Sequence, residues 1–276
     1  MRTSVQALVG KGNIFAFVYG EEGVGKTRLA LSLAPGGKGL GVITPEAGGP
    51  LALASAGAGA VPVDLIELNG QDPVEQVLKA LRVMGSDPSI NTVLLDGMTV
   101  LSGHIISHIT GGGTEKQMGF DGWGQMLGGL RAVSFACEQL KKQGKNLVMT
   151  AWEAPPEYEE TMAGQQLKAS GRPYLLGKAK FWLPGGCDIV ARMTSKMVNA
   201  KGPDGKLTKT WKGELHFDRD GIWLAKSRWP LPSPFPADFA KLLASVKGAA
   251  ASMSSATPVA KPGPKPVPPT SSKPKG

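Results

Sequence analysis

The chain has 276 residues, of which 41% are hydrophobic and 19% are charged, and its formal net charge at pH 7 is +9. This length suits one large domain or two small ones, and no apolar run is long enough to span a bilayer. The first residues lack the pattern of a secretion signal, and two cysteines are too few for a disulfide framework. We therefore expect a cytoplasmic protein with reduced thiols.

The first predicted elements are a buried strand over 13–19, a glycine-rich turn, and a helix over 26–33. The turn fits the phosphate-binding pattern G-x-x-x-x-G-K-[ST] at every fixed position. Its residues are Gly20, Glu21, Glu22, Gly23, Val24, Gly25, Lys26 and Thr27. Glycines let successive backbone N–H groups curl around phosphates, and the helix N-terminus adds a positive dipole end. We expect Lys26 to reach the β- and γ-phosphates of ATP and the Thr27 hydroxyl to ligate Mg²⁺.

Apolar strands alternate with helices along the next part of the chain. The predicted strands cover residues 39–44, 63–68, 91–96 and 146–150, and the predicted helices cover 73–84, 99–109 and 123–143. Each strand is almost wholly apolar, which is typical of parallel strands that have helices on both faces of their sheet. The predicted fold class is therefore α/β, with a mostly parallel sheet flanked by helices.

The sequence changes in character after about residue 152. A polar segment with prolines and glycines, 153–179, is interpreted as a long loop or a lid. The strands predicted beyond it cover 187–193, 208–217 and 221–226. The turn at 218–221 (DRDG) suits a late β-hairpin between the last two strands. A short closing helix is predicted over 237–246.

The C-terminal residues 249–276 differ from the rest of the chain in composition. They contain seven prolines and four lysines but no acidic residue. Such a segment cannot bury enough apolar surface to offset the entropy that is lost on ordering. We therefore divide the chain into a folded domain, 1–248, and a disordered basic tail, 249–276. The tail is either a solubilising extension or a nonspecific tether to nucleic acid or to a partner.

Asp96 is the candidate second residue of a metal site. It ends an apolar strand, which places its carboxylate at the carboxyl edge of the parallel sheet, beside the phosphate loop. There it can hold Mg²⁺ through water or through Thr27. The alternative is an ordinary strand-end aspartate that begins a turn with Gly97.

Glu46 is the candidate for orienting the attacking water. The residue after Asp96 is a glycine, so no glutamate adjoins Asp96 to polarise a water. Glu46 follows the second strand, where a carboxylate can face the γ-phosphate. The alternative is a solvated loop glutamate. At the end of strand 146–150, Thr150 and Glu153 are further candidates for sensing the γ-phosphate.

Lys226 and Arg228 form the last candidate group. They alternate with Ser227, so both side chains point to one face of an extended segment. Two cations on one face, far in sequence from the phosphate loop, suit an element that reaches the γ-phosphate of a neighbouring subunit. The alternative is a solvated basic strand end. The candidate catalytic residues are Lys26, Glu46, Lys226 and Arg228.

In their order along the chain, these motifs resemble the RecA-like ATPases, and more closely the short phage-encoded members grouped with the Sak-type single-strand annealing proteins. The matching segments are 20–27 (GEEGVGKT), 45–49 (PEAGG), 92–97 (TVLLDG), 146–153 (NLVMTAWE), 172–178 (RPYLLGK), 187–192 (CDIVAR) and 225–228 (AKSR). The resemblance implies a RecA-like core, ATP sites at subunit interfaces, and single-stranded DNA binding by the loops that follow the fourth and fifth core strands. By position these loops are 110–122 and 153–179.

The leading expectation is therefore an ATPase that uses ATP and Mg²⁺ and acts on single-stranded DNA in recombination or strand annealing. The resemblance also implies a homo-oligomer, as a ring or filament, in the host-cell cytoplasm if the protein is phage-encoded. A single-strand binding or replication protein is a further candidate partner, and no membrane partner is expected. Two alternatives stay open. One is an ATP-binding scaffold of a replication or packaging complex with little turnover, and the other, less favoured, is a small-molecule P-loop kinase.

Overall fold

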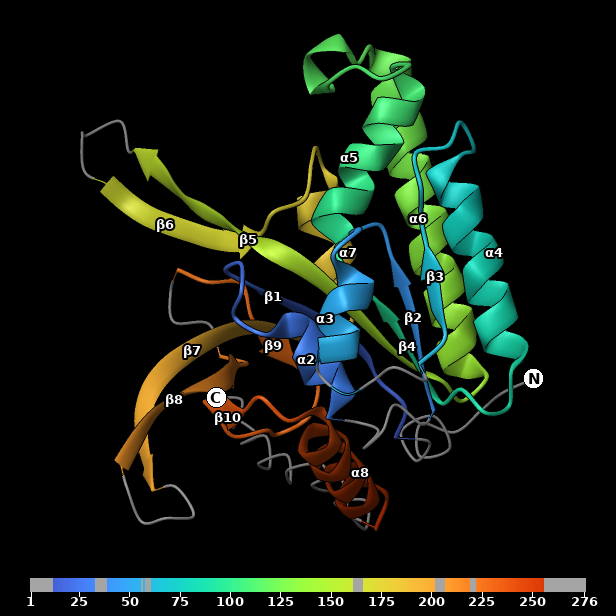
Figure 1. The fold of residues 1–276 in the computed structure, drawn as a ribbon. Helices are drawn as coiled ribbons and strands as arrows, with labels where there is room; N and C mark the ends of the chain where they lie inside the picture. The colour runs from blue at the N-terminus through green and yellow to red at the C-terminus, as the bar shows by residue number, and fades with distance from the viewer. Residues whose placement is uncertain are drawn as a thin grey trace, which may run out of the picture.

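The computed structural model describes residues 12–32, 39–55, 57, 61–160, 166–201, 207–218 and 222–255. These residues build a ten-stranded sheet with helices on both faces (Figure 1). The strands are β1 (Phe15–Gly20), β2 (Leu40–Thr44), β3 (Val63–Leu65), β4 (Thr92–Leu95), β5 (Asn146–Glu160), β6 (Gln166–Pro173), β7 (Ile189–Lys201), β8 (Leu207–His216), β9 (Lys226–Ser227) and β10 (Phe235–Pro236). The helices are α2 (Lys26–Leu31), α3 (Gly49–Ser55), α4 (Pro73–Ser86), α5 (Met98–Ile109), the 3₁₀ turn η2 (Glu115–Gln117), α6 (Phe120–Lys142), α7 (Ala179–Gly186) and α8 (Phe239–Ser255).

The strand order is β10-β8-β7-β1-β5-β4-β2-β3, with β6 paired to β5 and β9 to β7. Strands β1 to β5 and β7 run parallel to their neighbours in the centre of the sheet. Strands β8, β9 and β10 pair antiparallel at one side. The predicted α/β class with a mostly parallel sheet is confirmed. Because β5 lies between β1 and β4, side chains at the ends of these three strands are neighbours.

The side chains of β1 alternate between two hydrophobic clusters. Phe15, Phe17 and Tyr19 belong to the cluster under α4, α5, α6 and α7. Ala16 and Val18 belong to the cluster under α2, α3 and α8. Successive side chains of a strand point to opposite faces, and here helices cover both faces, so every residue of β1 is buried. Each large apolar side chain buried in this way stabilises the fold by roughly 1.5–3 kcal/mol, which holds the end of β1 firmly in place.

The prediction that 153–179 is a loop or a lid is wrong. Strand β5 continues beyond the edge of the main sheet and pairs with β6 in an antiparallel arm, and α7 follows (Figure 1). The prolines that suggested a loop, Pro155 and Pro156, fall in the irregularity of this ladder between Ala154 and Glu157. Prolines are tolerated at such a point because the ladder needs no N–H donor there.

The predicted pairing of the late hairpin is also wrong. Strand β8 pairs with β7 from Arg192 to Lys201, and β9 pairs with β7 as well rather than with β8. The turn sequence at 218–221 favours a local hairpin, but the long edge of β7 offers both strands a partner. Residues 202–206, between β7 and β8, lie outside the described residues.

The closing helix is longer than predicted. Helix α8 extends to Ser255, so it includes residues that were assigned to the tail from 249 onwards. The rest of the predicted tail, 256–276, lies outside the described residues. Among the helices that are described, none is long and apolar enough to cross a membrane.

Candidate nucleotide site

The predicted phosphate loop lies at the carboxyl end of β1 and leads into α2. Gly23 and Gly25 have φ angles of +72° and +99°, which side chains of L-residues rarely allow, so this curl of the backbone requires glycine. Gly20 is required for a different reason. A Cβ atom at this position would lie 2.3 Å from the carbonyl oxygen of Met193 in β7. The loop takes this shape because glycine stands at all three positions.

The ammonium group of Lys26 lies inside the loop. Its Nζ donates hydrogen bonds to the carbonyl oxygens of Gly20 (2.9 Å) and Glu21 (2.7 Å). Burial lowers the pKa of Lys26, and the negative charges of Asp96 and Glu46 oppose this shift. The loop therefore holds a positive charge among backbone groups, which is the arrangement that a phosphate-binding lysine needs.

Asp96 follows β4 and is held by hydroxyl groups from two other elements. Thr27 Oγ1 donates to one carboxylate oxygen (2.7 Å), and Thr150 Oγ1 donates to the other (2.5 Å). The Thr150 hydroxyl also accepts a hydrogen bond from the backbone N–H of Gly97 (2.9 Å). The structure thus brings Asp96 and Thr27 together, as expected. The part played by Thr150 was not predicted, because it depends on β5 lying next to β4.

Glu46 is half-buried and faces the same site. Its backbone N–H donates to Thr44 Oγ1 (3.0 Å), which fixes the turn after β2. Its carboxylate lies so close to Gly97 that a Cβ atom there would be 2.6 Å from Oε1. Burial raises the pKa of Glu46, the nearby Asp96 charge raises it further, and Lys26 lowers it. This environment differs from that of a solvated loop glutamate.

A cavity of about 420 Å³ opens between these groups. Its walls include the phosphate loop, Glu46, Asp96, Thr150 and Trp152. The carboxyl ends of β1, β2, β4 and β5 meet here, which is the edge at which open parallel sheets bind their ligands. The volume is within the usual range of small-molecule sites.

These residues fit ATP with Mg²⁺. The loop offers backbone N–H groups and Lys26 to phosphates, and Thr27 with Asp96 offers oxygen ligands to a hard cation. Across the described residues, no group of three or more His, Cys, Asp and Glu side chains could hold a metal ion alone.

Glu153 is engaged away from the cavity. Its carboxylate accepts hydrogen bonds from Nε (2.7 Å) and Nη2 (3.1 Å) of Arg192, whose guanidinium stacks 3.7 Å from the ring centroid of Trp223. The Glu153 side chain is only 8% exposed, so this bidentate pair is mostly buried. Of the two candidates for sensing the γ-phosphate, Thr150 lines the cavity and Glu153 does not.

Lys226 and Arg228 lie near the amino ends of β1 and β7, whereas the phosphate loop follows the carboxyl end of β1. Lys226 Nζ donates to the carbonyl oxygen of Gly185 (2.6 Å), and Arg228 pairs with the buried carboxylate of Asp188 (3.2 Å). The structure does not bring these two cations to the nucleotide site of their own chain. Their action on a neighbouring subunit stays a prediction.

A model of the AAA domain family matches residues 13–229, a range that includes the phosphate loop, Glu46 and Asp96. Among solved structures, a KaiC-like protein from the hyperthermophilic archaeon Pyrococcus horikoshii OT3 is similar over 76% of this chain and 88% of that chain, at 11% sequence identity and a TM-score of 0.38. No curated protein matches the chain. The family match covers most of the chain and the whole nucleotide site, so the chain belongs to the AAA domain family and is an ATP-binding P-loop ATPase.

Proposed function

We propose that this ATPase hydrolyses ATP with Glu46 as the residue that orients the attacking water, and that it couples the reaction to single-stranded DNA in recombination or strand annealing. The observation that carries the proposal is the position of the Glu46 carboxylate. It stands against Gly97 on the wall of the cavity that Lys26 also lines, and burial raises its pKa. Asp96 is less suited to this role, because both of its oxygens accept hydrogen bonds from hydroxyls.

Bound ATP supplies the phosphate chain, and its Mg²⁺ supplies charge that neutralises the phosphates. The phosphate loop and Lys26 hold the phosphates, while Thr27 and Asp96 hold the cation. Glu46 accepts a hydrogen bond from a water molecule and orients it for attack. A carboxylate with a raised pKa is a stronger base once it is ionised, so burial of Glu46 favours this role.

The coupling to DNA is supported by the charge of the chain and by the order of its motifs. A formal net charge of +9 favours a polyanionic partner. The motif order resembles that of the phage-type annealing ATPases, and this resemblance implies a ring or filament of this chain on single-stranded DNA. In such an assembly Lys226 and Arg228 would act on the nucleotide of a neighbouring subunit.

The test is the ATP turnover of the full-length protein with and without single-stranded DNA. The proposal expects DNA to stimulate turnover, and the Glu46→Gln protein to bind ATP but to remain slow with DNA. Tight ATP binding with negligible turnover under both conditions would instead favour a scaffold. Turnover that requires a small-molecule acceptor would favour a kinase.

A further inference from the structure

Strands β7 and β8 form a two-stranded ribbon that projects from the main sheet, at the lower left of Figure 1. Strand β7 pairs with β1 only through 189–192, and β10 pairs with β8 only at Glu214 and Leu215. Outwards from the Ser195–Gly213 pair, no third strand lies beside the ribbon among the described residues. We call this outer part the β7–β8 ribbon.

Large apolar side chains are exposed on one face of the β7–β8 ribbon. Trp211 is 67% exposed and lies directly opposite Met197, which is 51% exposed. Leu207 is 69% exposed, and it shares the face of Trp211 because the two residues are separated by an even number of positions on β8. Exposed apolar side chains that gather in this way mark a surface that binds a partner.

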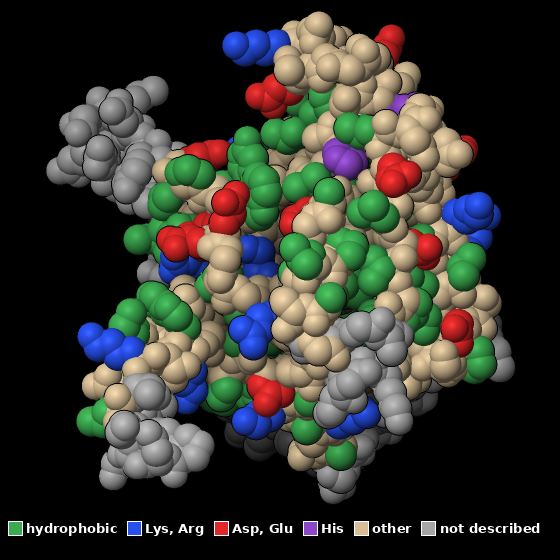
Figure 2. Space-filling model, in the orientation of Figure 1, with side chains coloured by type: hydrophobic (Ala, Val, Ile, Leu, Met, Phe, Trp, Pro, Cys, Tyr) green, Lys and Arg blue, Asp and Glu red, His purple; other side chains and the backbone are tan. Residues whose placement is uncertain are grey.

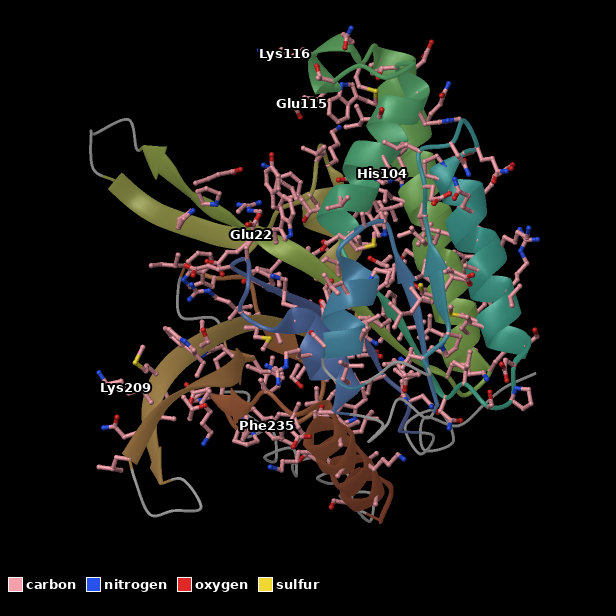
Figure 3. All side chains as sticks on the ribbon, in the orientation of Figure 1. Glu22, His104, Glu115, Lys116, Lys209 and Phe235 are labelled. Carbon is pink, nitrogen blue, oxygen red and sulfur yellow. The ribbon has the colours of Figure 1, made fainter. Side chains whose placement is uncertain are left out.

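The same ribbon is strongly basic. Its described residues, 195–201 and 207–212, contain four lysines and no acidic residue. Lys209 and Lys212 are exposed; Lys209 shares the face of Trp211, whereas Lys212 points to the opposite face of the ribbon. Figure 2 shows Lys and Arg side chains beside hydrophobic ones on this part of the surface, and Figure 3 shows Lys209 on the outer part of the ribbon. A polyanion with flat apolar groups matches this combination of side chains.

Neither segment that the resemblance suggested for DNA binding has this character. Residues 153–179 contain four glutamates against two lysines and one arginine, and residues 110–122 contain two acidic residues and one lysine. In the β5–β6 arm, Glu157 pairs with Lys180 (2.7 Å), so this nearby cation is already neutralised. An acidic arm repels a phosphate backbone, whereas the β7–β8 ribbon attracts it.

We propose that the β7–β8 ribbon is the single-stranded DNA-binding surface of this protein, with Trp211 stacking on a base and with Lys209, on the same face, contacting a phosphate. The proposal rests on the proposed function, because it assigns the DNA site of the same ATPase. A single strand fits better than a duplex, since a stacking side chain needs the open face of a base. Met193, at the foot of the ribbon, lies against Gly20 and Gly25, so the ribbon is anchored on the phosphate loop.

The experiment measures binding of the full-length protein to a fluorescein-labelled oligo-dT by anisotropy at several salt concentrations. Trp211→Ala is expected to weaken binding by about 5- to 150-fold, the range that loss of one base–aromatic stack produces. The Lys209→Ala protein is expected to lower the slope of log affinity against log salt by about 0.7, the value for one lost phosphate contact. Lys196 is left in place because it pairs with Glu214.

Matched controls carry comparable changes on helices α6 and α4, away from the ribbon (Figure 1). Phe135 on α6 is 61% exposed and Lys79 on α4 is exposed, so Phe135→Ala and Lys79→Ala should leave affinity and salt slope unchanged. Basal ATP turnover without DNA should be that of the unaltered protein in all four variants.

Three results would overturn the proposal in distinguishable ways. If the unaltered protein binds no oligo-dT, the proposed function itself fails. If it binds and the ribbon variants bind equally well, while Lys116→Glu in the loop after α5 abolishes binding, the DNA site lies elsewhere and the proposed function stands. If the ribbon variants instead lose self-assembly by mass photometry in the absence of DNA, the ribbon is an interface between copies of this chain.

Discussion

Asp96 shows how this site holds a buried carboxylate. The residue is only 3% exposed, and a charge in such a place is costly unless hydrogen-bond donors surround it. Thr27 and Thr150 supply two hydroxyl donors, one to each oxygen. The hydroxyl of Thr150 in turn accepts from the N–H of Gly97, so one side chain fixes both the carboxylate and the backbone that follows it.

Replacing Thr150 with valine tests this arrangement at nearly constant volume. Thr150→Val removes a donor to Asp96 and the acceptor of the Gly97 N–H, so we expect a loss of about 1–3 kcal/mol in the free energy of unfolding. Because Asp96 loses a fixed orientation, the Mg²⁺ concentration that gives half-maximal ATP turnover should rise. Ser102→Ala is the matched control, since it also removes a buried hydroxyl bond but has no contact with Asp96. An unchanged Mg²⁺ dependence in Thr150→Val would contradict the positioning role.

Glu46→Gln is expected to preserve ATP binding and to slow hydrolysis by roughly 10²-fold or more, because an amide cannot take a proton from water. Affinity for a fluorescent ATP analogue and single-turnover hydrolysis measure the two effects separately. Glu75→Gln on the exposed face of α4 is the control for loss of one negative charge. Normal hydrolysis in Glu46→Gln would move the water-orienting role to another residue.

The pH profile gives an independent test of Glu46. Burial, followed by the Asp96 charge, raises the pKa of this carboxyl above its ordinary value. Only the ionised form can accept a proton, so turnover should be full above the raised pKa and should be lost as pH falls through it. The acid limb of the turnover profile should therefore lie above the ordinary glutamate range. This acid limb should be absent from the residual activity of Glu46→Gln. If turnover of the unaltered protein stays constant down to the pH range in which an ordinary glutamate titrates, Glu46 does not act as the base.

Strand β5 links the site to two projecting elements. Its first half lies between β1 and β4 and brings Thr150 and Trp152 to the cavity. Its second half leaves the main sheet as the β5–β6 arm. At the junction, Glu153 binds Arg192 of β7, so one ion pair connects the foot of the arm to the strand that forms the β7–β8 ribbon.

The two ion pairs of this region should differ in strength. Glu153 and Arg192 form a bidentate, mostly buried pair, whereas Glu157 and Lys180 form a more exposed one. Arg192→Met should therefore lower the free energy of unfolding by about 3–5 kcal/mol, because it leaves a buried carboxylate unpaired. Lys180→Met should change it by at most about 1 kcal/mol. Urea denaturation of both variants measures these free energies of unfolding. Equal losses in the two variants would show that burial does not strengthen the pair of Glu153 and Arg192.

At the scale of the whole molecule, the two candidate cations lie away from the site of their own chain. Arg228 helps to neutralise the buried Asp188, which also accepts from the backbone N–H of Phe15 (2.8 Å) and pairs with Lys141. Arg228 is nevertheless 59% exposed, so its guanidinium remains accessible to a neighbouring subunit. An arginine supplied by a neighbouring subunit raises the rate of nucleotide hydrolysis by about 10³- to 10⁵-fold, and it makes hydrolysis depend on assembly.

Mixing two inactive proteins tests this action between subunits. Lys26→Ala should lose nucleotide binding or turnover, and Arg228→Ala should lose turnover. Mixed assemblies should regain part of the activity at interfaces that pair an intact loop with an intact arginine. Lys141→Ala controls for the structural effect, because it removes another partner of Asp188 and should remain active. Absence of recovery in mixtures that are shown to co-assemble would mean that Arg228 acts within its own chain or not at all.

Features that depend on contiguous residues could be predicted from the amino-acid sequence. The phosphate loop, the strand before it and the helix after it were all predicted, because glycine spacing and apolar runs are local patterns. The placement of Asp96 at a strand end was predicted for the same reason, since an apolar run that stops at a carboxylate marks the edge of a parallel sheet. Helices α4, α5 and α6 were also predicted to within a few residues.

Features that depend on which strands lie side by side could be seen only in the folded chain. The contact of Thr150 with Asp96 exists because β5 inserts between β1 and β4, and the pair of Glu153 with Arg192 exists because β5 and β7 flank β1 on either side. The β5–β6 arm was mistaken for a loop because its prolines sit in a ladder irregularity that sequence does not reveal. The β7–β8 ribbon was missed because local turn chemistry favoured a different partner. Strand pairing joins residues that are distant in the chain, so the free energy that selects one partner over another is set by the whole sheet and not by any short segment.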